Sequence, residues 1–327
     1  MRRRPFFQAV GFVLACVVML SAAGCGEDER SVTGATAGAV EPTAAFGAGT
    51  GLGDGFEVAE GSTLIGTPIP LGTTVVFNGE PIVDDGWRAF LYVDGEPEAV
   101  VDAYLAQADE RGLTPVPLPD SEVFAEEGKA PPQGWGRCGS NDGLGYRCLA
   151  AASDGDATCL AVDLMRERGA SHLELTLMRN YRFDVPCGAP AGVVVRGDEV
   201  VPDPPDRWPA LPGPGEPFGE RWEYLSEIPV QDGSRVVAAP IHHDMCDTVT
   251  AALAVDGEPL DVLDRYVAAF GAVMNIEPDV TDERVERGGV VLERRRINEP
   301  AGGRSFTADL VVDAEGQGWL YLSGCAG

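Results

Sequence analysis

Two of the chain's three histidines lie in one short polar stretch, Ile241-His242-His243-Asp244-Met245-Cys246. If this stretch is a strand, alternate side chains share a side, so His242, Asp244 and Cys246 could offer three ligands to a zinc ion. The alternative is a polar strand that ends in half of a disulfide, because an oxidised cysteine has no thiolate to bind a metal. No HExxH or CxxC pattern supports a metal. We assign none, and His242 and Asp244 stay the candidate ligands.

The rest of the sequence contains no recognisable catalytic motif. A serine nucleophile needs a histidine base, but GxSxG is absent, and His172 lies in an alternating pattern that we interpret as a surface position on a strand. Carboxylates are so numerous that no pair of them stands out as an acid and a base. Asp154-Gly155-Asp156 lacks the spacing and the glutamate of a calcium loop and predicts a turn. We therefore predict no enzyme activity and no cofactor.

The chain begins with the three parts of a secretion signal. Arg2, Arg3 and Arg4 form a basic start, an apolar run follows over residues 6–20, and small residues lead to Cys25. The apolar run is short for a transmembrane helix. The three-part pattern predicts a signal peptide that is removed on export.

The residues Ala22-Ala23-Gly24-Cys25 resemble the lipobox of bacterial lipoproteins. In that family the cysteine is acylated, with chains such as palmitate, and the signal is cut directly before it. The resemblance implies that Cys25 is the lipidated first residue of the mature protein, on the extracytoplasmic side of a membrane. The family usually has Leu where this chain has Ala22. Val13-Leu14-Ala15-Cys16 is a second match that would leave almost no apolar run, and an ordinary signal peptide cut near Ala23 is the other alternative.

The formal net charge of −28 limits the partners of the chain. An acidic surface repels nucleic acid, so we exclude DNA and RNA as partners. It also repels an anionic bilayer, so acyl chains rather than surface charge must hold the protein on a membrane.

Eight cysteines are present, of which Cys16 leaves with the signal and Cys25 takes the lipid. An even number of the others in an exported chain predicts disulfides, although six cysteines allow 15 pairings. Two of them flank the turn predicted at 153–156 and are expected to face each other across paired strands. The three disulfides that we expect are Cys148–Cys159, Cys138–Cys187 and Cys246–Cys325.

The pentapeptide Val-Asp-Gly-Glu-Pro occurs twice, at 93–97 and at 255–259. The pattern VxDxY[LV]A follows both copies. Ile69-Pro70-Leu71 and a Val-Val pair precede the first copy, and we match them to Ile228-Pro229-Val230 and the Val-Val pair before the second. This ordered set of matches predicts an internal duplication.

The pentapeptide itself predicts a corner between a strand and a helix. Asp-Gly favours a turn, and proline is well tolerated at the first position of a helix. Apolar residues then recur at helical spacing. They are Val101, Tyr104, Leu105 and Ala108 after the first copy, and Leu263, Tyr266, Val267, Phe270 and Met274 after the second.

Strand patterns follow each predicted helix, over 146–151, 158–164 and 173–178 and over 290–292, 306–312 and 319–322. We therefore expect an α+β fold of two tandem related modules, each a small antiparallel sheet with one packed helix in the order strand, helix, three strands. The expected divisions are a signal peptide at 1–24, lipidated Cys25 with a flexible tether to 60, a first module at 61–183, a proline-rich linker at 184–220 and a second module at 221–327.

These patterns together predict a membrane-anchored lipoprotein of the cell envelope with a non-catalytic binding or scaffolding role. Its partners are expected to be the lipid bilayer, through acylated Cys25, and an envelope protein or small ligand. The alternative is a metal-dependent or acid–base hydrolase that uses His242, His243 and Asp244.

Overall fold

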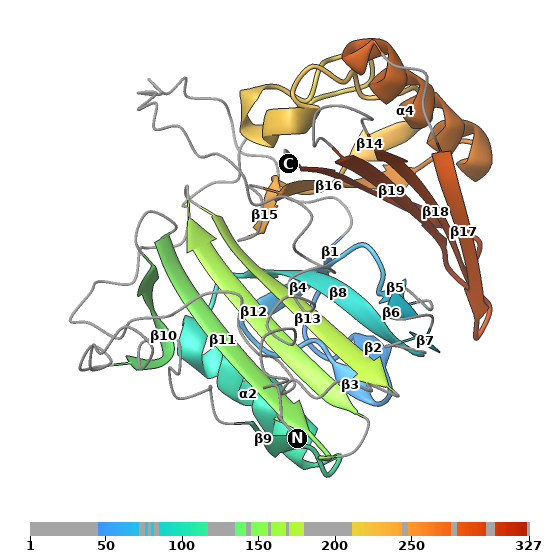
Figure 1. Cartoon of the computed structure of the whole chain (residues 1–327). Coiled ribbons are helices and arrows are strands. Elements are labelled where there is room, and N and C mark those ends of the chain that lie inside the picture. Colours follow the sequence, from blue (N-terminus) through green and yellow to red (C-terminus); the bar gives the residue numbers. More distant parts are fainter. Residues whose placement is uncertain are drawn as a thin grey trace, which may run out of the picture.

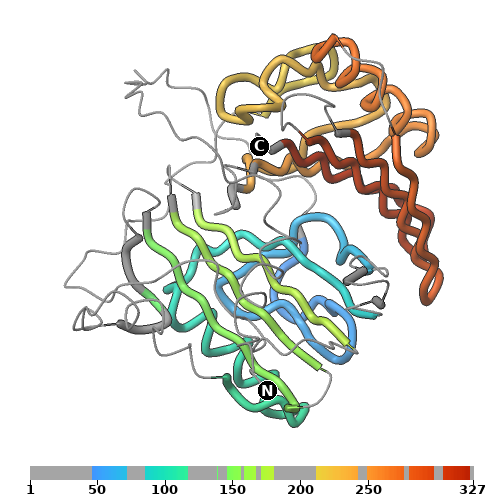
Figure 2. The backbone as a smooth tube through the Cα atoms, viewed as in Figure 1, coloured from blue at the N-terminus to red at the C-terminus, as the bar shows by residue number. Residues whose placement is uncertain are grey.

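Two large antiparallel sheets, stacked face to face, form most of the computed structural model (Figure 1). Figure 2 shows that the blue-to-green half of the chain forms one sheet and the yellow-to-red half forms the other. The residues that the structure describes are 45–71, 76–77, 80–81, 85–116, 135–141, 145–155, 158–167, 170–179, 211–243, 248–275, 280–298 and 305–325.

The first sheet has nine strands, and helix α2 (Pro97–Asp109) follows its strand β8. In order across the sheet, the main path is β1 (Ala45–Phe46), β4 (Ser62–Ile65), β8 (Asp85–Val93), β13 (Ala170–Arg179), β12 (Cys159–Glu167), β11 (Gly145–Ser153) and β10 (Trp135–Asn141). Off this path, β5 (Ile69–Pro70) pairs with β8, and β9 (Thr114–Pro115) pairs with β11. Two small hairpins are β2 (Gly51–Gly53) with β3 (Phe56–Glu57), and β6 (Val76–Phe77) with β7 (Glu80–Pro81).

The second sheet has seven strands, and helix α4 (Pro259–Met274) follows its strand β16. In order across the sheet, the main path is β14 (Ser234–Val236), β16 (Thr248–Val255), β20 (Gly318–Cys325), β19 (Ser305–Val312), β18 (Val290–Asn298) and β17 (Val280–Arg287). Strand β15 (Ile241–His243) also pairs with β16, and a short 3-10 helix, η1 (Glu220–Leu225), precedes the sheet.

Each helix covers the outer face of its own sheet, and the inner faces pack on each other. Buried residues of α2, such as Val101 and Tyr104, share a core with Leu91 and Leu173, and α4 shares a second core with β19 and β20. A third core lies between the sheets and takes side chains from both. Its members from the first sheet are Ile65, Ile69, Phe90 and Tyr92, and those from the second half include Ala239, Ile241, Ala252, Leu292, Val311, Trp319 and Tyr321.

The predicted fold class, α+β with two small modules, is wrong. The described residues are mostly β-sheet, with two α-helices and one 3-10 helix, and the sheets have nine and seven strands rather than four each. The shared inter-sheet core also means that neither half buries all of its apolar surface alone. Both sheets nevertheless follow one strand order, β8-β13-β12-β11-β10 and β16-β20-β19-β18-β17. In the chain, helix α2 directly follows β8, and helix α4 directly follows β16.

The repeated pentapeptide forms the predicted corner in both places. Helix α2 begins at Pro97 and α4 at Pro259, directly after the corner. The amide of Gly95 donates to the carbonyl of Gly61, and the amide of Gly257 donates to that of Gly233. Each N–O distance is 3.0 Å. The corner thus needs glycines because two backbone segments approach each other closely there.

The leading strands of the two halves correspond differently from the predicted match. Ser62 pairs with Val93 as Ser234 pairs with Val255, and both serines contact a helix tyrosine, Tyr104 at 3.0 Å and Tyr266 at 2.8 Å.

Ile69, which pairs with strand β8, likewise takes the place of Ile241, which pairs with β16, and not that of Ile228. The offset is 172 residues here (241 − 69) but 162 at the pentapeptide (255 − 93). The ten extra residues of the first half fall after β5, where the β6–β7 hairpin lies.

Two predicted flexible segments are partly folded. The tether was expected to reach residue 60, but Leu52, Phe56 and Val58 are buried in the first core. The linker was expected to reach residue 220, but Phe218 is buried in the second core and its amide donates to Ile228. In both places burial of apolar side chains offsets the entropy cost of ordering a glycine- or proline-rich chain.

Candidate functional site

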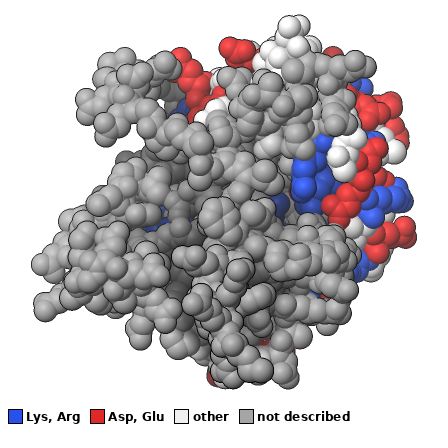
Figure 3. All heavy atoms as spheres, viewed as in Figure 1, with Lys and Arg blue, Asp and Glu red and all other residues white. Residues whose placement is uncertain are grey.

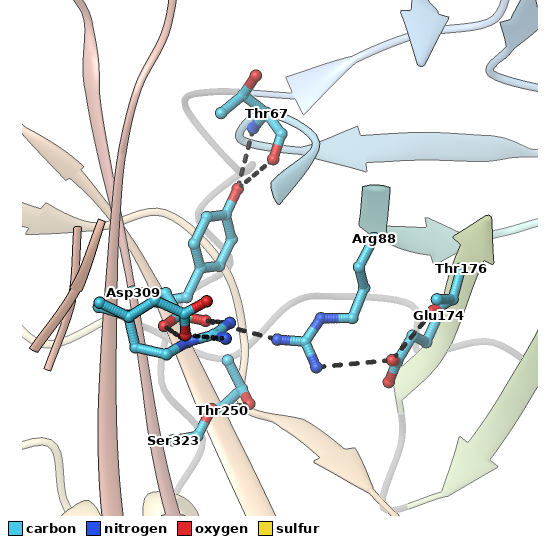
Figure 4. Close-up of polar contacts among 10 residues, drawn as sticks. Thr67, Arg88, Glu174, Thr176, Thr250, Asp309 and Ser323 are labelled. Carbon is cyan, nitrogen blue, oxygen red and sulfur yellow. Dashed lines mark hydrogen bonds and ion pairs between the residues drawn. The ribbon is translucent and has the colours of Figure 1, made fainter. Parts of the chain in front are cut away.

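Charged and hydroxyl side chains gather between the two sheets, beside the apolar inter-sheet core (Figure 4). Strands β8 and β13 contribute from the first sheet, and β16 to β20 contribute from the second. We call this group the inter-sheet cluster. Its members are Arg88, Glu174, Thr250, Glu283, Arg294, Asp309 and Ser323.

Asp309 and Arg294 form the buried centre of the inter-sheet cluster. They are direct partners on strands β19 and β18, and Arg294 donates from Nε and Nη2 to the two oxygens of Asp309 at 2.6 and 2.9 Å. Arg294 also donates to Glu283 at 3.3 Å. Burial alone would lower the pKa of the Arg294 guanidinium, but Asp309 and then Glu283 outweigh it and raise that pKa. Arg294 therefore keeps its charge.

Arg88 connects the two sheets electrostatically. One terminal nitrogen of its guanidinium lies 3.7 Å from Glu174 on the first sheet, and the other lies 3.6 Å from Asp309 on the second. The guanidinium also lies over the ring of Phe90, 5.0 Å from its centroid. Its buried Nε has no hydrogen-bond partner within the described part of the chain. The ion pairs of Arg88 thus span the interface without a direct hydrogen bond.

Two buried tyrosine hydroxyls make direct hydrogen bonds between the halves. Tyr321 on β20 donates to the carbonyl of Thr67 at 2.7 Å and accepts from the amide of Thr67 at 2.9 Å. Tyr92 on β8 accepts from the amide of Ala239. Burial raises the pKa of both tyrosines above the ordinary value, against the opposing effect of these backbone hydrogen bonds. Both hydroxyls therefore stay protonated at neutral pH.

His172 is not a surface residue, contrary to the alternation of its strand. Only 4% of it is exposed, and its ring centroid lies 5.3 Å from that of Tyr92. An alternating pattern implies one solvated face only if nothing covers that face. Here the second sheet packs on the face of β13 that the pattern left polar.

The chemistry of the inter-sheet cluster favours a role in holding the sheets together. Guanidinium groups do not exchange protons near neutral pH, and each carboxylate in the cluster lies against one. Thr250 and Ser323 hydrogen-bond each other at 2.7 Å on neighbouring strands. In the ranges that the structure covers, no three His, Cys, Asp or Glu side chains form a group that could hold a metal ion.

The predicted lipid and metal residues fall mostly outside the described residues. Cys25, Asp244 and Cys246 lie outside them, and of His242 and His243 only the backbone, in strand β15, is described. That backbone pairs with Val249 and Thr248 of β16. The lipidation site and the candidate metal ligands therefore stay predictions.

Two of the predicted disulfides are wrong. Cys148 bonds to Cys138, its direct partner on β10, and not to Cys159. The turn between β11 and β12 was predicted correctly, but its register places Cys159 opposite Ser153 and Cys148 opposite Leu164. Cys138 is therefore not free to pair with Cys187, which lies outside the described residues. Cys159 is disulfide-bonded as well. Cys246 lies outside the described part, so its predicted bond to Cys325 on β20 is not tested.

Comparison with known proteins identifies no family for this chain. No family model matches the sequence, and no curated protein matches it. A solved structure titled "Mycobacterium avium subs paratuberculosis tesB protein MAP1729c" aligns at 14% identity over 74% of this chain and 93% of that one, with a TM-score of 0.14. A score this low shows no shared fold. Within the described residues, no helix is both long and apolar enough to cross a membrane.

Proposed function

We propose that this chain is an exported lipoprotein of the cell envelope, held on the outer side of a membrane by acylated Cys25, with a non-catalytic binding or scaffolding role. Its partners would be the bilayer and an envelope protein or small ligand. The observation that supports the non-catalytic role is the inter-sheet cluster, whose charged groups pair with one another across the sheets. The basic start and the apolar run before Cys25 support the anchor.

Membrane fractionation with a palmitate analogue tests the anchor. We expect the wild-type chain to carry the label and to sediment with membranes, because two or more acyl chains bind a bilayer stably. Cys25→Ser should lose the label and enter the soluble fraction, and the matched variant Cys16→Ser should behave as wild type. A labelled, membrane-bound Cys25→Ser protein would overturn the proposal. Loss of the label in Cys16→Ser alone would move the lipid to the earlier match.

The alternative, a hydrolase that uses His242, His243 and Asp244, is separated from this proposal by metal content. Its motivation is that two of the three histidines lie together in that stretch. Elemental analysis of the purified chain should find no bound zinc if the role is non-catalytic. Stoichiometric zinc that His242→Ala removes would favour the hydrolase.

A further inference from the structure

Strand β17 (Val280–Arg287) is the last strand of the second sheet, and no other described strand pairs with its outer edge. In Figure 1 it lies at the right-hand margin of the molecule. Most of its residues are exposed, including Arg284 and Glu286. A free edge offers backbone N–H and C=O groups to another strand, so the identity of the side chains decides which strand can pair there.

The charges of β17 are arranged with opposite sign on the two sides of Val285. Arg284 precedes Val285 by one residue and Glu286 follows it by one. Glu283 precedes Val285 by two residues and Arg287 follows it by two, so each pair combines one acidic and one basic residue. Figure 3 shows basic and acidic side chains interspersed on the right-hand face of the molecule. A two-fold interface brings a surface against a copy of itself, so a pattern that reverses sign about its centre is complementary to its own copy.

We propose that β17 pairs antiparallel with β17 of a second copy of this chain, with the two-fold axis at Val285. In this register Arg284 lies opposite the second copy's Glu286, and Glu283 lies opposite the second copy's Arg287. Both pairs occur twice because of the symmetry. Val285 lies opposite itself at the centre. Opposite charges that face each other across strands stabilise the pairing. The second sheet of one copy and the second sheet of the other would then form one continuous sheet.

The other two-fold registers are less favourable. Residues that lie opposite each other must point to the same face of the joined sheet. The two-fold axis can therefore pass only through a residue of β17 and not between two residues. An axis at Arg284 places Asp282 opposite Glu286, which is a like-charge pair. An axis at Glu283 leaves only the pair of Asp282 with Arg284, and an axis at Glu286 leaves no opposite-charge pair. The register at Val285 is therefore the one that the charges select.

The pair of Arg284 with Glu286 is expected to carry most of the selectivity. Glu283 already contacts Arg294 at 3.3 Å, and Arg287 contacts Asp85 and two carbonyls of the first half in its own chain. The side chains of Arg284 and Glu286 are 57% and 68% exposed and lie 3.8 Å apart along their own strand. Arg284 also contacts Glu293. Charges on an edge strand normally discourage pairing with any other strand. Here the charges disfavour strands of other proteins but are complementary to the same strand of a second copy.

Charge exchange tests the proposal by sedimentation velocity on the purified full chain in detergent micelles. Arg284→Glu places Glu opposite Glu286, and Glu286→Arg places Arg opposite Arg284, so each variant alone should dimerise about tenfold more weakly than wild type. An equimolar mixture of the two restores both pairs and should form mixed dimers. The double variant R284E/E286R should regain wild-type dimerisation. A wild-type chain that stays monomeric up to about 0.1 mM would overturn the proposal.

Site-directed crosslinking tests the register. Val285→Cys should form a dimer through a disulfide under mild oxidation, because residues directly opposite each other have Cβ atoms about 4.5–5.5 Å apart. The matched control is Thr281→Cys, whose two copies would lie about 27 Å apart in this register. Wild type sets the background from the native cysteines, and circular dichroism checks the fold of each variant. Equal crosslinking of both variants, or none above background, would contradict the register.

Discussion

The hydroxyl of Tyr321 hydrogen-bonds the carbonyl of Thr67 at 2.7 Å, although 254 residues separate the two in the chain. The amide of Thr67 returns a hydrogen bond of 2.9 Å to the same hydroxyl. The last strand of the chain is thereby fixed to the loop that follows β4 in the first sheet. Because this contact lies beside the shared apolar core, we expect the two sheets to unfold together rather than as independent parts.

Tyr321→Phe should lower the free energy of unfolding by about 1–3 kcal/mol, because it leaves the amide and carbonyl of Thr67 without their partner at a part-buried position. The ring contact with Phe90, at 5.8 Å between centroids, is retained, so the loss reports on the hydroxyl alone. Urea unfolding followed by tryptophan fluorescence and by circular dichroism measures it. Two separate transitions in the wild-type chain would contradict the shared unfolding that this contact implies.

Stability should fall as pH rises above about 10. Burial raises the pKa of four tyrosines above the ordinary value of 10.0, while their hydrogen bonds act in the opposite direction. The folded chain therefore keeps protons that the unfolded chain releases, so the stabilisation is complete below pH 10 and is lost above it. The residues are Tyr92, Tyr104, Tyr266 and Tyr321.

Unfolding free energies measured from pH 8 to 11 test this dependence, with about 0.5 pH unit between points. The double variant Tyr92→Phe/Tyr321→Phe removes two of the groups, so its stability should fall less steeply with pH than that of wild type. The comparison uses slopes, so the loss of stability that the substitutions themselves cause does not affect it. Parallel curves for the two proteins would show that these tyrosines do not cause the alkaline loss.

Asp309→Asn should be strongly destabilising, by about 3–5 kcal/mol, because the buried, charged Arg294 loses the carboxylate that it binds from both Nε and Nη2 and keeps only the longer contact with Glu283. The matched control is Asp282→Asn. Asp282 pairs with Arg295 at 3.0 Å on the neighbouring strand, and these side chains are 62% and 19% exposed, whereas those of Asp309 and Arg294 are 4% and 8% exposed. Solvent screens the exposed pair, so the control should lose about 1 kcal/mol at most. Equal losses in the two variants would contradict a special role for the inter-sheet cluster.

Local patterns predicted the parts of the fold that local chemistry controls. The helices begin at the predicted prolines, and their predicted apolar faces hold the buried residues Tyr104 and Tyr266. The turn after Ser153 also forms where Asp-Gly indicated it, since Asp154 accepts a hydrogen bond from the amide of Thr158 at 3.0 Å. All of these features depend on contacts within a few residues.

Features that depend on distant contacts were missed. Strand β17 carries charges on both faces and no alternation, so its extended form comes from pairing with β18. The burial of His172 and the roles of Arg88 and Asp309 depend on how the two sheets stack, which no local pattern encodes. The disulfide between Cys138 and Cys148 depends on a strand, β10, that was not predicted. Glycine-rich residues near 45–60 fold because an existing core accepts Leu52 and Phe56.

Gly95→Ala should destabilise the chain more than Gly257→Ala, although both change the same position of the repeated pentapeptide. A Cβ atom on Gly95 would lie 3.0 Å from the Cα atom of Gly61, whereas one on Gly257 would lie 3.3 Å from that of Gly233. Overpacking against backbone forces the segments apart, so we expect losses of about 2–3 kcal/mol for Gly95→Ala and about 1 kcal/mol for Gly257→Ala.

Thermal unfolding of both variants checks this order, and Gly47→Ala is the matched control because nothing lies within 4 Å of the added atom there. The control should stay within about 0.5 kcal/mol of wild type. If both corner variants were as stable as the control, the pentapeptide would not be repeated for its close backbone approach. A polar role for its aspartate and glutamate would then have to explain why the chain carries it twice.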